Sequence, residues 1–524
     1  MTSANNEYIK WMQVSIMAAT LEAKYKEHKD DVFNLLILIF IASVFGVYLI
    51  ATTVLIARDG VYYIERAQKL SSDPVGVIKG HPPGYPFLIF AAHKFVTLFT
   101  NNSSVFTWIY TAQSVTLLCR LIALIPLYFI GKFLVGSKIT FWATLILIIL
   151  PYPAEFGSDA LRDWPHILFL AAGFLLLLWG AKQGKWWMFG IAGLAGGLGY
   201  IIRPECAQLV IYGALWLSIR WFLPTNNMNR TKVVCALLIL LIGFAVPAGP
   251  YMKAKGRILP AKLEHLISFS YQSQSQGVVK EDIDNHNDVY ETVSLPGNVA
   301  KAIYRLIVKI SDNLMHFFTL ILVIGIYSRF HKQSKATDIE RFFVPVFIAL
   351  NVIMMILLYC GYGYISRRHC LPLIVCTIFY VPIGLQISAD WLSSRFSKGR
   401  LVNNPNPQLW FFILVAVGVG ICLPKLTSPL RIEKQGYRDA VKWLKENTTQ
   451  EDLIAVPDSR IGFYAERNTL VSKSKNAFEG VDYIVSLGKD ESEQLKVGRV
   501  VQEKLSLWLD KRRKKNRLII YEVL

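Results

Sequence analysis

The chain has 524 residues, 53% of them hydrophobic, and carries 56 lysines and arginines against 37 aspartates and glutamates, a formal net charge of +19. Soluble domains have about 45–50% apolar residues, so this composition argues against a soluble protein. The basic residues are scattered between apolar segments, which argues against nucleic-acid binding and fits the basic loops of a membrane protein.

The N-terminal residues 1–32 are polar and charged and show no cleavable signal peptide, so we expect a cytoplasmic segment. Residues 33–428 contain apolar blocks that are long enough, or nearly so, to cross a bilayer core of about 30 Å. They predict a polytopic α-helical membrane domain. The candidate spans are 33–56, 85–100, 105–130, 139–152, 164–180, 187–202, 205–222, 233–252, 314–328, 342–360, 369–388 and 409–424.

Positive charge predicts the orientation of these spans, because short loops rich in lysine and arginine stay in the cytoplasm. A cytoplasmic N-terminus places all five basic loops on that side only if residues 85–130 make a net single crossing. We therefore expect 11 or 13 spans. The five loops carry Lys132 and Lys138, Lys182 and Lys185, Arg220 to Lys232, Arg329 to Arg341, and Arg395 to Arg400.

The remaining loops then face outward and carry charges that break the pattern. Asp59 follows the first span directly, and an acid at a membrane boundary is costly enough to suggest function. Misplaced charges that gather on one face predict a site there. The main outward loops are 57–84, 151–163 and 253–313, and the charges are Asp59, Asp159, Asp163, Arg203, Arg367 and Arg368.

Two of these loops have further features. Residues 62–70 have the helical spacing of a short helix lying in the membrane interface, before a proline-rich entry to the next span. We expect residues 253–313, in which the stretch 268–276 is rich in serine and glutamine, to form a mobile loop over the site.

Residues 429–524 are of mixed polarity and predict a small soluble α/β domain on the outer side. The pattern indicates a helix near 437–444, strands at 453–456, 483–486 and 518–521, and a helix over 494–510. The basic run 511–515 is typical of a solvated face, with lipid headgroups as the functional alternative. All seven cysteines lie in or beside apolar segments without metal-binding spacing, which favours core positions.

The outward charges belong to an ordered set of motifs. These are Asp59, a tyrosine-rich helix, His81-Pro82-Pro83-Gly84-Tyr85-Pro86, Leu161-Arg162-Asp163, Gly199 to Pro204, Arg367-Arg368 before Leu371-Pro372, and the tail pieces 437–447 and 452–454. The set resembles the GT-C superfamily of membrane glycosyltransferases. The likeness covers most of the chain and is greatest to the branch that holds the protein O-mannosyltransferases and the lipid A aminoarabinose transferase.

The resemblance implies an inverting hexosyl- or pentosyltransferase that moves a sugar from a polyprenyl phosphate to a glycan, lipid or protein acceptor. Its site would face the outside of a membrane, with a bacterial inner membrane as our default. Asp59 would be the base and Asp163 a second acid, with Asp159 competing for that role. The cations implied for the donor phosphate are Arg367, Arg368, His81, Arg58, Lys79 and Arg203.

The sequence departs from the family pattern at two positions. His81 falls where some members have a lysine, and a neutral histidine would anchor a phosphate more weakly. Gly60 stands where many relatives have a second acid, so a metal held by an acidic pair is not expected there. We expect no cofactor, and a divalent metal stays open.

Each assignment has a structural alternative. Asp59 would pair with Arg58, Asp163 would start a helix, Arg203 would pair with Glu205, and His81 would order the proline loop. The arginines 367–368 would anchor the chain at the interface. For the whole protein, the alternative is a lipid-linked sugar flippase or a transporter without chemistry, although the two related halves typical of transporters are not evident.

Overall fold

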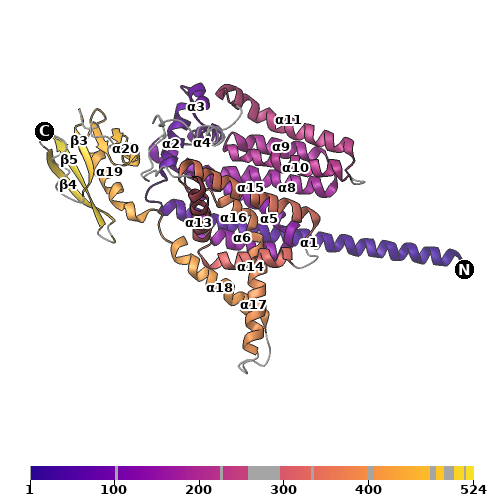
Figure 1. The fold of residues 1–524 in the computed structure, drawn as a ribbon. Coiled ribbons are helices and arrows are strands. Elements are labelled where there is room, and N and C mark those ends of the chain that lie inside the picture. Colours follow the sequence, from indigo (N-terminus) through magenta and orange to yellow (C-terminus); the bar gives the residue numbers. More distant parts are fainter. Residues whose placement is uncertain are drawn as a thin grey trace.

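The computed structural model describes residues 2–100, 104–224, 228–257, 295–331, 336–397, 406–471, 480–488, 501–510, 512 and 515–524. Helices make up most of the described residues as far as Leu426, and a five-stranded sheet lies at the opposite end from the N-terminus (Figure 1). Within the described residues seven helices are long and apolar enough to cross a membrane, or eight if one bent pair counts as a span. The chain is a helical integral membrane protein, and the count of 11 or 13 spans stays a prediction.

The described helices before the sheet fall into two groups along the chain. The first group is α1 (Thr2–Thr52), α2 (Arg58–Lys69), α3 (Pro74–Gly80), α4 (Gly84–Thr97), α5 (Val105–Val135), α6 (Ser137–Ile149), α7 (Pro151–Phe156), α8 (Asp163–Gln183) and α9 (Trp187–Tyr200). The second group is η1 (Pro204–Ala207), α10 (Gln208–Phe222), α11 (Arg230–Lys255), α13 (Leu295–Asn313), α14 (Phe317–His331), α15 (Asp338–Tyr362), α16 (Leu371–Thr377), η2 (Ile378–Tyr380), α17 (Val381–Ser397) and α18 (Pro407–Leu426).

Local sequence sets several of these helix ends. The side chains of Asn229 and Thr337 accept hydrogen bonds from backbone N–H groups of the first turns of α11 and α15. Gly256 and Gly363 end the same two helices in the left-handed conformation, which costs glycine little. Both helices therefore have capping residues at each end of a long apolar run.

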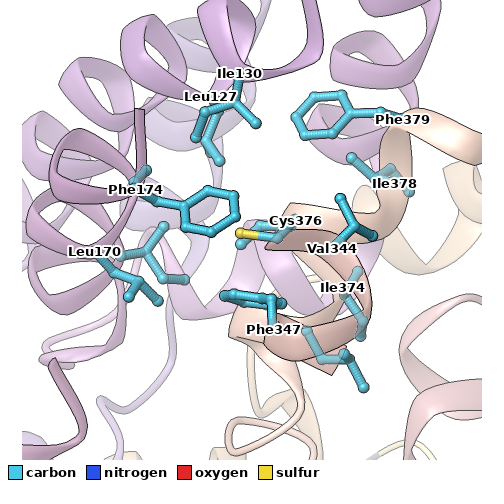
Figure 2. Close-up of a cluster of buried hydrophobic side chains, with 14 of the residues drawn as sticks. Leu127, Ile130, Leu170, Phe174, Val344, Phe347, Ile374, Cys376, Ile378 and Phe379 are labelled. Atoms are coloured by element: carbon cyan, nitrogen blue, oxygen red, sulfur yellow. The ribbon is translucent and has the colours of Figure 1, made fainter. Parts of the chain in front are cut away.

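The helical bundle closes on a dry core. Figure 2 shows side chains from α5, α8, α15 and the α16–η2 segment meeting in one cluster, with Phe174, Phe347 and Cys376 pointing inward. All seven cysteines are free; the predicted core position is confirmed for the five that are buried, whereas Cys235 and Cys360 are partly exposed. This packing fixes α8, whose first residue is Asp163, and α16, which begins three residues after Arg368.

The structure corrects two expectations for the outward loops. The interfacial helix starts at Arg58 rather than at residue 62, so Asp59 lies in its first turn. The segment 253–313 is helical at both ends, because α11 continues to Lys255 and α13 covers Leu295–Asn313. The stretch 268–276 lies outside the described residues. Helices α13 and α14 meet at an angle of 107°, where Met315 and His316 have positive φ.

The C-terminal residues form a mixed sheet with the strand order β2-β1-β3-β5-β4. Strand β1 pairs in parallel with β2 and β3, and β5 pairs antiparallel with β3 and β4. The elements are η3 (Ile432–Lys434), α19 (Gln435–Asn447), β1 (Leu453–Val456), α20 (Ser459–Ala465), β2 (Asn468–Val471), β3 (Tyr483–Gly488), β4 (Val501–Asp510) and β5 (Lys515–Val523).

The three predicted strands coincide with β1, β3 and β5. The helix expected over 494–510 is wrong for its described part, because Val501–Asp510 is the edge strand β4. Residues 494–500 and most of the basic run 511–515 lie outside the described residues, and Arg512 is exposed.

The C-terminal unit packs directly against the membrane domain. One buried cluster joins Tyr63 and Ile64 of α2 to Val441 and Leu444 of α19 and to the inner face of the sheet. In Figure 1 the sheet and α19 lie beside α2, on the side away from the N-terminus. The shared core brings residues beyond position 430 to the segment that carries Asp59.

Candidate active site

Residues 53–57, which precede α2, position Asp59. Hydrogen bonds from the C-terminal unit hold this segment on both sides. The Val54 N–H donates to the Leu430 carbonyl at 3.1 Å, and the Ile56 N–H donates to the Tyr464 hydroxyl at 3.0 Å. The Arg460 guanidinium donates to the Ile56 carbonyl at 3.1 Å. These bonds fix the entry to α2, so the first turn of that helix depends on residues about 400 positions away in the sequence.

Five charged side chains alternate in sign next to that turn: Asp59, Arg368, Asp163, Arg203 and Glu205. The Arg368 Nη2 donates to Asp59 Oδ2 at 2.7 Å, and Arg368 Nη1 lies 4.0 Å from Asp163 Oδ2. The other oxygen of Asp163 accepts from Arg203 Nη1 at 2.6 Å, and Arg203 Nε donates to Glu205 at 3.2 Å. The structure thus joins charges from four different predicted loops into one row.

Exposure differs along this row. The Asp163 side chain is 5% exposed, whereas that of Asp59 is 38% exposed and lines a cavity. Burial disfavours the charged form of Arg368, but Asp163 and Asp59 outweigh it and raise the arginine pKa above its ordinary value. Arg203 shows the same balance, with Glu205 and Asp163 raising its pKa. Both arginines are fixed cations.

The cavity beside Asp59 has a volume of about 500 Å³. Six cationic and two acidic side chains line it, so it favours an anion. Most of the cations have carboxylate partners, but Arg367 and Lys434 form no ion pair within the described residues. The lining residues are Ala57, Arg58, Asp59, Glu155, Phe156, Leu161, Tyr364, Ser366, Arg367, Arg368, Arg431, Lys434 and Arg460.

Arg367 lies flat on an aromatic ring instead of pairing with an acid. Its guanidinium carbon is 4.0 Å from the centre of the Tyr152 ring, which stabilises the cation without neutralising it. The backbone carbonyl of Arg367 accepts from the Asn313 side chain at 3.0 Å, which anchors the turn before α16. The Arg367 guanidinium is therefore held in place at the cavity, and no ion pair within the described residues neutralises its charge.

In the C-terminal unit one carboxylate, Asp458, lies between two arginines. This carboxylate caps α20 and accepts from Arg460 Nη2 at 2.6 Å and from Arg58 Nη2 at 3.1 Å. Burial opposes its ionisation, but the hydrogen bonds and charges of Arg460 and Arg58 lower the pKa of Asp458 to about 2. Burial, together with Arg460, lowers the pKa of nearby Lys434 to about 8.

Asp159 lies in a different place from Asp163. It is fully buried, accepts from the backbone N–H groups of Ala57 at 3.1 Å and Ala160 at 2.8 Å, and pairs with Arg431 at 2.5 Å. Arg431 also donates to the Leu55 carbonyl at 2.9 Å and adopts a left-handed backbone with φ 58°. Asp159 does not line the cavity; its contacts hold the chain before Asp59.

The other predicted phosphate ligands lie outside the cavity lining. Lys79 is exposed on α3, and the exposed His81 packs edge-on against the Tyr62 ring with 5.1 Å between ring centres. Arg203 is buried against Asp163 and Glu205. Arg58, Arg367 and Arg368 do line the cavity.

The outcome for the structural alternatives is mixed. Asp59 pairs with Arg368 rather than with Arg58, so that structural alternative is wrong, and Arg58 contacts Asp458 instead. The alternative pair of Arg203 with Glu205 is present. Asp163 does begin α8, without a side-chain capping bond, and also contacts both arginines.

Sequence reasoning missed Arg431, Lys434 and Arg460. Arg431 and Lys434 follow the last apolar span on its predicted outward side, so the signal that selected Arg367 and Arg368 was present there too. Arg460 carried no such signal. Among the described residues no three His, Cys, Asp or Glu side chains gather to hold a metal ion. The expectation of a metal-free site stays a prediction.

Three comparisons with known proteins show what this chain is similar to. The family described as dolichyl-phosphate-mannose-protein mannosyltransferase matches residues 80–248. No curated protein matches the chain. Solved structures match over most of the chain at low identity, which shows a shared fold.

Two of these structures are informative. ArnT from Cupriavidus metallidurans, solved with undecaprenyl phosphate, is 11% identical with a TM-score of 0.56, over 93% of this chain and 97% of that chain. The oligosaccharyltransferase AglB from Archaeoglobus fulgidus, solved with an inhibitory peptide and a dolichol-phosphate, is 12% identical with a TM-score of 0.50, over 87% of this chain and 69% of that chain. The resemblance to the GT-C superfamily of glycosyltransferases is thereby confirmed.

Proposed function

We propose that the protein is an inverting glycosyltransferase that moves a sugar from a polyprenyl phosphate to an acceptor hydroxyl on the outer face of the membrane. The observation that carries this proposal is the cation-lined cavity whose wall contains Asp59. The GT-C fold and the lipid phosphates in the ArnT and AglB structures support a lipid-phosphate donor. The positive-inside pattern supports the outer face, and a bacterial inner membrane is the proposed location.

Asp59 is the proposed base. It takes the proton of the acceptor hydroxyl while the hydroxyl oxygen attacks the anomeric carbon from the side opposite the phosphate. The bond from that carbon to the phosphate oxygen breaks, and its electron pair leaves with the polyprenyl phosphate. The configuration at the anomeric carbon is thereby inverted, and no covalent intermediate forms between the sugar and the enzyme.

Arg367 and Arg368 are the proposed anchors of the donor phosphate. Arginine forks match phosphate oxygens, and charge that grows on the leaving phosphate strengthens these contacts in the transition state. Arg368 bonds Asp59 in the structure. A phosphate that takes over this arginine would release the carboxylate and make it a better proton acceptor. Asp163, the proposed second acid, contacts Arg203 and Arg368 and orients them.

The decisive experiment incubates the purified full-length protein with radiolabelled polyprenyl-phosphate sugars and candidate acceptors in detergent or vesicles. Consumption of one donor with release of free polyprenyl phosphate is the expected result. Movement of the headgroup across vesicles without consumption would instead support the flippase alternative and overturn the transferase.

A further inference from the structure

The cavity contains more positive charge than a donor phosphate needs, and the excess is concentrated on the C-terminal wall. Lys434, Arg58 and Arg460 lie near one carboxylate, Asp458. With Glu433, which also acts on Lys434, three cations face two acids, so one positive charge of this group stays uncompensated. None of these five residues belongs to the turn that carries Arg367 and Arg368.

Asp458 has no capacity left for Lys434. Its Oδ1 accepts from Arg460 Nε at 2.9 Å, and its Oδ2 accepts from Arg460 Nη2 and from Arg58 Nε and Nη2. The remaining guanidinium nitrogen of Arg460, Nη1, donates to the Ile56 carbonyl, and the side chain is buried. Arg58 is different, because its side chain is 40% exposed and Nη1 makes no hydrogen bond within the described residues.

Lys434 and Arg58 are therefore the two cations of this wall that can bind something else. Lys434 forms no ion pair within the described part of the chain, and its nearest aromatic ring, Tyr437, is centred 5.9 Å from Nζ. Like charges held together beside a cavity are costly until an anion joins them. Burial is the main cause of the lowered pKa of Lys434, and the charge of Arg460 adds to it.

The position of this pair relative to the base suggests which substrate uses it. Arg58 and Asp59 are consecutive residues of α2, so their side chains point about 100° apart around the helix axis. Asp59 bonds Arg368 on one side, and Arg58 points to Asp458 and the C-terminal wall on the other. A molecule that gives its hydroxyl to Asp59 would have Arg58 within its reach.

We propose that Arg58 and Lys434 form a second anion subsite, and that the acceptor carries a phosphate or carboxylate group close to its reacting hydroxyl. This inference rests on the proposed function for the identity of the acceptor. The subsite itself is tested independently. It predicts that a neutral glycan is a poorer acceptor than the same glycan bearing an acidic group.

The test measures dissociation constants by calorimetry on the full-length protein in detergent micelles. Glucose 6-phosphate probes the proposed subsite, glucose is its neutral counterpart, and undecaprenyl phosphate probes the donor site. Lys434→Gln and Arg367→Gln separate the two sites. Lys434→Arg keeps the charge, and Lys442→Gln is the matched control on an exposed position of α19.

We expect wild type to bind glucose 6-phosphate and not glucose. Lys434→Gln should weaken that binding roughly tenfold or more, since one charge-assisted contact is lost, while Lys434→Arg and Lys442→Gln retain it. Undecaprenyl phosphate should bind Lys434→Gln as it binds wild type and should bind Arg367→Gln more weakly.

Two results would overturn the subsite. One is no binding of glucose 6-phosphate by wild type at millimolar concentration. The other is loss of undecaprenyl phosphate rather than glucose 6-phosphate in Lys434→Gln, which would assign the lysine to the donor. Lys434-dependent binding of glucose 6-phosphate without any binding of undecaprenyl phosphate would leave the subsite standing and overturn the proposed function.

Discussion

The guanidinium of Arg431 donates to the carboxylate of Asp159 at 2.5 Å, although the two residues are 272 positions apart in the sequence. Asp159 in turn accepts from the Ala57 N–H, two residues before Asp59. A buried ion pair between the membrane domain and the C-terminal unit thus holds the chain that presents the proposed base. The C-terminal unit is part of the site rather than an appendage to it.

Arg431→Ala should destabilise the protein by about 3–5 kcal/mol, because it leaves the buried Asp159 carboxylate with its backbone N–H donors but without its cationic partner. We expect a lower unfolding temperature in detergent and a fall in kcat larger than the rise in KM, since the entry to α2 loosens. The double variant Arg431→Gln with Asp159→Asn buries no charge and should recover part of the stability. An Arg431→Ala protein as stable and active as wild type would contradict the role of this pair.

Asp59→Asn should lower turnover by about 10²–10⁴-fold, the usual contribution of a general base. The change is nearly isosteric and the side chain is partly exposed, so folding and binding of undecaprenyl phosphate should persist. Asp30→Asn, at an exposed position of α1, is the control for loss of one carboxylate. Wild-type turnover in Asp59→Asn would remove the central assignment.

Binding of glucose 6-phosphate should weaken as the pH rises above 8. Burial and Arg460 lower the pKa of Lys434 to about 8, and Arg58, Asp458 and Glu433 also act on it. Above that pH the free protein loses the lysine charge, and binding must take up a proton, so the dissociation constant rises by up to about tenfold per pH unit. Lys434→Arg stays charged and should flatten this profile between pH 7 and about 9. The same slope in both proteins would exclude Lys434 as its source.

Asp458 should stabilise the C-terminal unit at neutral pH and lose this contribution in acid. Its pKa is lowered to about 2 from 3.8, so the stabilisation is complete above the unfolded value and disappears as the pH falls from about 4 to 2. The shift corresponds to about 2 kcal/mol. Urea unfolding followed by tryptophan fluorescence at pH 7 and pH 3 measures it. Asp458→Asn should reduce the difference between the two pH values, whereas the exposed Glu451→Gln should not.

The C-terminal strands illustrate how far a local pattern can be trusted. Buried β1 and β5 are short apolar runs and were predicted, since their sequences fit no other element. In β4, Val501, Leu505 and Trp508 have helical spacing, while Leu505, Leu507 and Leu509 alternate as in a strand. Pairing with β5 at the sheet edge decides between the two. A sequence pattern that fits both the helix period and the strand period cannot show which of the two elements forms.

The sequence by itself determined the membrane class, through its apolar blocks, and its charge asymmetry predicted which loops face outward. It also singled out Asp59, Asp163, Arg367 and Arg368, because an uncompensated charge at a membrane boundary is costly wherever the chain goes next. These are properties of single residues in a known solvent, so they are visible without a fold.

Only the tertiary structure decided which of these charges meet. It paired Asp59 with Arg368 rather than with its neighbour Arg58, buried Asp159 against Arg431, and brought Lys434 and Arg460 to the cavity. Ion pairs depend on distances of a few ångströms between residues hundreds of positions apart. Those distances are set by the shared core of α2, α19 and the sheet, and no local pattern encodes them.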